Sequence, residues 1–268
     1  MPTLSQTLSQ FYLENFGVKP LVDSNESLSA WFTHGFGQNL LAAEKSVMDQ
    51  LLPEIYGYHL MELSVLKDTL LSEQCPITHH FSISPCHSQN IQAQAVFEQL
   101  PIDEESIDAA ILHHALEYST NPHQLLRDTA RAIIPNGYIV LIGFNPWGLL
   151  QAKKILGRYI LRKDHWRYHR LFRNRLLDWL QVLDFDVVFR QNYGFDLPLN
   201  CITPKWLDKT LGTCAPFSGN FYVLVARKTK VPMTMIKQPW KKKNRLSQWV
   251  KQPVVSRGSI HSSSTKNK

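Results

Sequence analysis

Cysteine is scarce in this sequence, and the signals that direct a chain into or across a membrane are missing. Only four cysteines occur among 268 residues, and none forms a CxxC pair, which excludes a secreted scaffold held by disulfides. No Lys or Arg precedes Lys19, so we expect no signal peptide. The most apolar run, Tyr138–Phe144, is far shorter than the roughly 20 residues of a membrane-spanning helix. We therefore expect a cytoplasmic protein without a transmembrane segment.

Acidic residues are missing from the C-terminal end of the chain. No Asp or Glu accompanies the Lys and Arg residues between Arg227 and Lys268, whereas residues 1–226 hold all 22 acidic residues. The net charge of +7 is therefore a property of this tail. Cations interleaved with Trp240 and Trp249 are typical of segments that contact RNA or an anionic membrane. A disordered end that keeps the protein soluble explains the same composition.

Two motifs of other α/β enzymes are absent, and no metal pattern replaces them. No GxSxG occurs, which argues against a serine hydrolase, and no GxGxxG follows the first predicted strand, which disfavours a nicotinamide-dependent dehydrogenase. Cys75, His79, His80, Cys86 and His87 lie close together, but their spacing does not match common zinc patterns. Neighbouring histidines on a strand would also point to opposite faces of the sheet. We therefore predict no metal site.

What the sequence does contain, after Pro53, is an alternation of short apolar runs with helical segments. This alternation predicts an α/β domain with a mostly parallel sheet. The predicted strands are Tyr58–Leu63, His79–Ile83, Ile91–Phe97, Ile107–Leu112, Tyr138–Phe144, Phe185–Arg190 and Phe221–Ala226. Helices are predicted over Leu4–Phe16, Gln38–Leu52, Trp147–Leu161 and Leu171–Leu183.

Two further segments have clear local signals. A helix is predicted to begin at Asn121-Pro122, because Asn can cap free amides and Pro at the first helical position loses no hydrogen bond. We expect Pro135-Asn136-Gly137 to end it. The aromatic, glycine-rich stretch Trp31–Gly37 lies between the first two predicted helices, where we expect its rings to pack.

Several motifs occur in an order that resembles one enzyme family. The stretch Leu100–Tyr118, which ends in His113-His114-Ala115-Leu116-Glu117-Tyr118, resembles the fourth-strand region of class I S-adenosylmethionine (SAM) dependent methyltransferases of the type 11 group. Asn121-Pro122 and the strand into Phe144-Asn145-Pro146 resemble that family's next helix and fifth strand. Leu183–Val188 and Tyr222–Lys228 are similar to its last two strands. The resemblance spans residues 55–228.

The resemblance implies a fold and a division of the chain. The fold is α/β, a Rossmann-like seven-stranded methyltransferase sheet with the last strand antiparallel and inserted between the fifth and sixth, and with helices on both faces. The chain divides into an N-terminal helical segment (1–54), a methyltransferase-like domain (55–228) and a basic flexible tail (229–268). SAM would lie across the carboxyl ends of the first strands, where open α/β sheets bind ligands.

The resemblance also implies site residues, although some family positions are altered. Glu62 occupies the acidic position of the first strand, whereas Ser64 and Leu66 stand where the family has glycine. The second strand ends in Ser82-Ile83-Ser84-Pro85 without a carboxylate for the ribose, and Val96 falls near a usual aspartate position. The implied cofactor contacts come from Glu62, Ser64, Ser84 and His113.

The predicted catalytic residues are His113 and His114, at the carboxyl end of the fourth strand. Imidazole titrates near neutral pH and can accept a proton from a methyl acceptor, although packing between sheet and helix explains both residues as well. The expected function is SAM-dependent methyl transfer to a small molecule, with RNA and protein acceptors left open. The alternative is a non-catalytic scaffold or binding protein on the same fold, because glycine and carboxylate positions of the family are altered.

Overall fold

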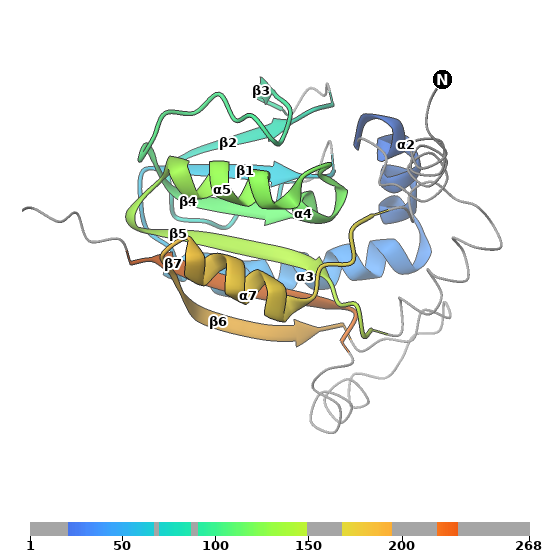
Figure 1. Cartoon of the computed structure of the whole chain (residues 1–268). Coiled ribbons are helices and arrows are strands. Elements are labelled where there is room, and N and C mark those ends of the chain that lie inside the picture. The colour runs from blue at the N-terminus through green and yellow to red at the C-terminus, as the bar shows by residue number, and fades with distance from the viewer. Residues whose placement is uncertain (1–20, 67–69, 87–90, 149–167, 195–218, 230–268) are drawn as a thin grey trace, which may run out of the picture. The chain divides into compact units, whose positions relative to one another are not determined.

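A computed structural model describes residues 21–66, 70–86, 91–148, 168–194 and 219–229 (Figure 1). The predicted helix Leu4–Phe16, most of the predicted helix Trp147–Leu161 and nearly all of the basic tail lie outside these residues. The helices and strands are α2 (Leu21–Thr33), α3 (Gly35–Leu51), η1 (Leu52–Glu54), β1 (His59–Ser64), β2 (His79–Ser84), β3 (Ala93–Gln94), β4 (Ile107–His113), α4 (Ala115–Tyr118), α5 (Pro122–Ala132), β5 (Ile133–Phe144), α7 (Arg173–Val182), β6 (Phe185–Tyr193) and β7 (Phe221–Lys228). All belong to one compact unit within Met1–Pro232.

Seven strands form one sheet in the order β3-β2-β1-β4-β5-β7-β6. Neighbours from β3 to β5 pair in parallel, whereas β7 pairs antiparallel with both β5 and β6. The predicted fold class is therefore confirmed, including the insertion of the last strand. In Figure 1, α5 and α7 lie in front of the sheet and α3 passes behind it. No described helix meets the length and apolarity that crossing a membrane requires.

The central strands are buried because helices cover both faces of a parallel sheet. Every residue of β4 except Asp108 is buried, and the stretch of β5 from Ile139 to Phe144 is buried throughout. Helix α5 packs through Leu125, Leu126 and Ala130. It begins as predicted, since the Asn121 side chain accepts a hydrogen bond from the Gln124 amide (3.3 Å) and Pro122 follows at the first position.

The largest differences from the predicted strand boundaries are at the third and fifth strands. The third strand is only two residues long, Ala93–Gln94, and is an outermost strand of the sheet. The fifth strand begins at Ile133, so Pro135-Asn136-Gly137 lies inside it and α5 ends earlier, at Ala132. Ile107 pairs with Ile133, and Ala109 pairs with Tyr138. The extra residues of β5 between these two pairs form a bulge. Asn136, at φ 66°, supplies a left-handed conformation there.

Helix α2 was not predicted, and it changes the role of the aromatic stretch Trp31–Gly37. Trp31 and Phe32 lie in α2, and only His34 separates this helix from α3. The Phe32 ring is stacked with that of Phe144 at the end of β5, with a centroid separation of 6.5 Å. The rings therefore pack against the sheet as well as between helices, and α2 and α3 share one hydrophobic core with the strands.

Candidate active site

The predicted site residues lie together at one edge of the sheet. Ser64, Ser84 and His113 are the last residues of β1, β2 and β4, and Ser64 is in register with His113. Glu62 is in register with Ser82. This edge contains the carboxyl ends of the parallel strands, where α/β sheets bind their ligands.

Glu62 holds the segment that follows β1. Its carboxylate is 1% exposed and accepts hydrogen bonds from the Leu71 amide (3.0 and 3.2 Å) and the Ser72 amide (3.2 Å). Burial raises the pKa of Glu62, and the hydrogen bonds from Leu71 and Ser72 oppose this rise without cancelling it. The side chain thus fixes the backbone beyond the first strand.

Ser64 and Leu66 form a turn that needs no glycine. The Ser64 hydroxyl accepts a hydrogen bond from the Leu66 amide (3.1 Å) and is hydrogen-bonded to Nδ1 of His113 (2.9 Å). Neither Ser64 nor Leu66 has a positive φ. Because the left-handed conformation that favours glycine is not used at these positions, side chains are accommodated without backbone strain.

The end of β2 provides hydroxyl groups, and neither β2 nor β3 ends in a carboxylate at the expected place. The Ser84 side chain is buried and accepts a hydrogen bond from the Cys86 amide (3.3 Å). Val96 is 59% exposed. The nearby carboxylate of Glu98 instead accepts hydrogen bonds from Ser119, Thr120 and Asn121, in the turn between α4 and α5.

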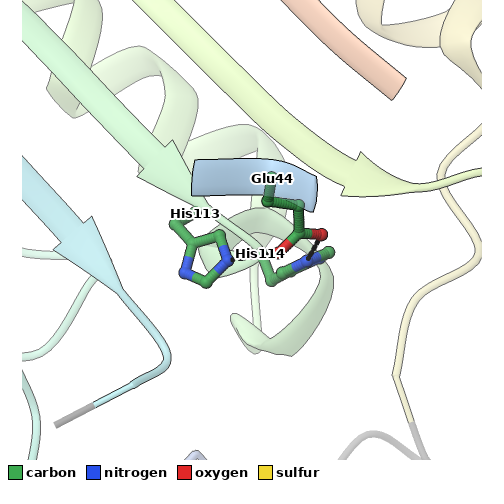
Figure 2. A group of neighbouring side chains, drawn as sticks. All are labelled: Glu44, His113 and His114. Carbon is green, nitrogen blue, oxygen red and sulfur yellow. Dashed lines mark hydrogen bonds and ion pairs between the residues drawn. The ribbon is translucent and has the colours of Figure 1, made fainter. Parts of the chain in front are cut away.

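The two predicted catalytic histidines are fully buried and contact a glutamate from the N-terminal part of the chain. Figure 2 shows Glu44 of α3 with its carboxylate directed toward the two imidazoles. Oε2 of Glu44 lies 3.1 Å from Nε2 of His113, and Oε1 lies 3.0 Å from Nε2 of His114. Nδ1 of His114 lies 2.8 Å from Oε2 of Glu117. No substrate reaches either ring in this arrangement, and the prediction that one acts as a base stays a prediction.

The pKa values of Glu44, His113 and His114 depend on one another. Burial alone would raise the pKa of Glu44, but the charge of His114 and hydrogen bonds from both histidines lower it to about 2. Burial opposes the charged form of His114, yet Glu44 and Glu117 raise its pKa to about 9. Burial lowers the pKa of His113. His114 is therefore an imidazolium between two carboxylates, and His113 is neutral.

Sequence reasoning missed Glu44, although the sequence contains a signal for it. Glu44 lies at helical spacing from Leu40, Val47 and Met48, which form the buried stripe of α3 together with it. A carboxylate on an apolar stripe requires a buried partner of opposite charge or a hydrogen-bond donor. That requirement does not identify the partner, which lies 69 positions away for His113.

A pocket of about 190 Å³ lies near the ends of β5 and β6. The exposed rings of Trp147 and Phe172, with centroids 6.1 Å apart, form part of its wall. The Asn145 side chain is anchored by donating to the carbonyl of Gly219 (2.7 Å). The lining residues are Asn145, Pro146, Trp147, Phe172, Arg173, Asn174 and Asn192.

The strand order and the polar carboxyl edge define a protein of the methyltransferase fold, and comparison with known proteins agrees. Residues 78–141 match the family model described as a methyltransferase domain. The chain is 34% identical over 195 residues to YafS, an uncharacterised protein of Escherichia coli K12, a match that covers 71% of this chain and 78% of YafS. The chain therefore belongs to one family with YafS, and it carries a methyltransferase domain of the class I fold.

Solved structures share the fold at low sequence identity. A SAM-dependent methyltransferase of Thermotoga maritima, described as a possible histamine N-methyltransferase, superimposes with a TM-score of 0.55 at 14% identity, covering 76% of this chain and 95% of that one. A chain from the complex of the Haloferax volcanii Trm112 methyltransferase activator with a methyltransferase gives a TM-score of 0.54 at 13% identity, covering 79% and 98%.

The residues of the edge are chemically compatible with the family's cofactor, SAM. Ser82 and Ser84 place hydroxyl groups, which can bind ribose hydroxyls, at the end of β2. The segment after β1 is held by Glu62, at the family's acidic position. The turn at Ser64 and Leu66 differs from a glycine loop, so the backbone must approach the cofactor in another way.

Proposed function

We propose that the chain transfers the methyl group of SAM to a small molecule at the carboxyl edge of the sheet. The observation that carries the proposal is the position of Glu62, whose buried carboxylate holds the segment after β1, the strand that pairs with β2 and β4. The methyltransferase order of the strands supports it.

In this proposal, four parts of the chain hold SAM. They are the segment fixed by Glu62, the backbone around Ser64, the end of β2 at Ser84 and the end of β4 near His113. Bound SAM supplies an electrophilic methyl group. The chain contributes mainly by positioning the acceptor in line with that group, since a base is needed only for a protonated nucleophile.

The pocket near β5 and β6 supports a small acceptor. It lies at the carboxyl end of these strands, on the same edge as the cofactor positions, and its volume of about 190 Å³ suits a small molecule. Trp147 and Phe172 offer aromatic faces to an apolar part of such a ligand.

The basic tail is part of the proposal as a separate contact with RNA or an anionic membrane. Two of the twelve cations between Arg227 and Lys268 belong instead to β7. Lys228 is buried, and its ammonium group donates to the carbonyls of Ala130 (2.8 Å) and Ile133 (2.5 Å). Lys228 therefore does not belong to a binding surface, and the contact falls to residues 230–268.

A non-catalytic scaffold is the second candidate function. Two positions that differ from the family pattern favour it. The Ser64 hydroxyl is already hydrogen-bonded to His113 and to the Leu66 amide. Val96, near a usual aspartate position, has no polar side-chain group. A scaffold would keep the fold and the polar networks but bind no SAM.

Calorimetric titration of the purified full chain with SAM and with S-adenosylhomocysteine separates the two functions. We expect binding of both ligands and about a tenfold loss of affinity in Glu62→Gln, because a segment that has lost a charge-assisted hydrogen bond worth roughly 1.5 kcal/mol must be ordered again when the ligand binds. Glu54→Gln, on the exposed turn η1, is the control and should bind as the wild type does. Absence of binding heat at millimolar ligand would favour the scaffold.

A further inference from the structure

Glu44, His113 and His114 form a compact group of donor atoms, which we call the histidine–glutamate cluster (Figure 2). One carboxylate oxygen and one nitrogen of each imidazole lie within 4.8 Å of one another. All three side chains are 0% exposed. They come from α3 and from the end of β4, which are far apart in the sequence.

The donor set is one that transition metals prefer. Both imidazoles direct Nε2 at the carboxylate, and each oxygen of Glu44 faces a different nitrogen (3.0 and 3.1 Å). Two imidazole nitrogens and one carboxylate are ligands of zinc and of non-haem iron. The carboxylate can supply one or both oxygens, so three residues offer up to four donor atoms.

The other nitrogen of each imidazole is held as in metal-binding histidines. Such histidines use the second ring nitrogen to hydrogen-bond a carboxylate, carbonyl or water, which orients the ring. Here Nδ1 of His114 faces Oε2 of Glu117 (2.8 Å), and Nδ1 of His113 faces the Ser64 hydroxyl (2.9 Å). Glu117 is itself fixed, because Oε1 accepts from the Phe144 amide (2.7 Å).

The balance of buried charge also favours a cation. Glu44 and Glu117 place two carboxylates in contact with the imidazoles, at 0% and 1% side-chain exposure. A divalent ion at this position would provide a partner for buried carboxylates that water does not reach.

Aromatic rings also lie against the imidazoles of the cluster. His114 adopts a left-handed conformation (φ 53°), which is uncommon for a residue other than glycine and places its ring beside that of His113. The His114 ring stacks on Phe144 with a centroid separation of 3.9 Å, and Phe32 covers both imidazoles. Such a shell holds ligands in place and limits exchange with water.

We propose that the histidine–glutamate cluster binds one divalent first-row transition-metal ion, which joins α3 to the carboxyl end of β4. This site does not rest on the proposed methyl transfer, because its donors face one another inside the protein. A bound ion would hold α3 against the end of β4, beside the place where the cofactor is proposed to lie.

The test is metal binding by the full chain, measured without SAM. Protein stripped with a chelator is dialysed against Zn²⁺ or Co²⁺, and its metal content is measured by mass spectrometry. We expect about one ion per chain, and an affinity lower by about tenfold or more in Glu44→Gln and His113→Asn. The control is His59→Gln with His79→Gln, an exposed pair whose Nδ1 atoms lie 3.1 Å apart and which could bind metal at the surface.

The outcomes decide the proposal even if a variant fails to fold. X-ray absorption of the zinc-loaded wild type should show nitrogen and oxygen ligands at about 2.0–2.2 Å with imidazole scattering. Failure of the wild type to bind metal, or loss of binding only in the surface control, overturns the site. Failure of SAM binding in a chain that holds metal contradicts only the proposed function.

Discussion

At the scale of single residues, this protein uses buried and half-buried carboxylates as hydrogen-bond acceptors for its own backbone. Glu62 holds the segment after β1, Glu117 accepts from the Phe144 amide, and Glu98 receives donors from the turn between α4 and α5. Each carboxylate satisfies backbone or side-chain donors that would otherwise lose hydrogen bonds on burial. The edge where SAM is proposed to bind is therefore shaped by polar contacts within the chain.

Glu98 provides a pH-dependent contribution to stability. Burial alone would raise the pKa of Glu98, but hydrogen bonds from Ser119, Thr120 and Asn121 outweigh it and lower the pKa. A lowered pKa in the folded state means that this stabilisation is present above about pH 4.5 and is lost as the pH falls further. We expect Glu98→Gln to lower the free energy of unfolding by about 1 kcal/mol at pH 7.

Urea unfolding of wild type and Glu98→Gln between pH 3 and pH 7 checks this. The difference between the two proteins should shrink toward the acid end of the range. Glu104→Gln, which changes an exposed carboxylate in a nearby turn, is the matched control. A difference that stays constant with pH would contradict the assignment to the ionised carboxylate of Glu98.

At the scale of elements, one buried lysine joins the last strand to the helix that precedes β5. The ammonium group of Lys228, on β7, donates to carbonyls at the end of α5 and the start of β5. A cation near a helix C-terminus also interacts favourably with the helix dipole. This contact ties the antiparallel strand to the parallel part of the sheet.

Replacing this lysine tests the connection. We expect Lys228→Met to lower the free energy of unfolding by about 2 kcal/mol, because buried carbonyls of Ala130 and Ile133 lose a charged donor. Arg227→Met, on the exposed side of the same strand, should change it by about 0.5 kcal/mol or less. Equal effects of the two variants in urea unfolding would show that the buried contact has no special role.

At the scale of the whole molecule, the N-terminal helices are part of the folded core. Leu28, Phe32, Met48 and Leu52 are at most 1% exposed and belong to the same hydrophobic cluster as the strands. Glu44 adds a polar contact between α3 and β4. The described part of 1–54 therefore supports the domain that the sequence places after it.

Two deletions separate the roles of the chain ends. Removing 1–54 should abolish cooperative thermal unfolding, since it takes large buried side chains from the core. Removing 230–268 leaves every described element in place, so the melting temperature and SAM binding should stay unchanged. We expect this second deletion to remove any salt-sensitive association with RNA or anionic vesicles. Loss of folding in the second deletion would show that the tail is structural.

The amino-acid sequence alone determined the order of the elements and most of the carboxyl edge. The buried runs of β4 and β5, the Asn121-Pro122 start of α5 and the closing strand β7 carry local signals, namely continuous apolar residues and a helix cap. The resemblance to class I methyltransferases assigned Glu62, Ser64, Ser84 and His113 to this edge, where a parallel sheet brings the ends of its strands together. These features depend on neighbours in the chain or on the topology of the sheet.

Tertiary structure alone decided which charged and aromatic side chains meet. Glu44 reaches His113 and His114, and Phe32 reaches Phe144, only because α2 and α3 fold back onto the end of β4 and β5. Local sequence marks Glu44 as a buried charge on an apolar stripe but does not choose its partner. Pairing across long sequence separations depends on how whole elements pack, since many packings satisfy the same local pattern of apolar residues.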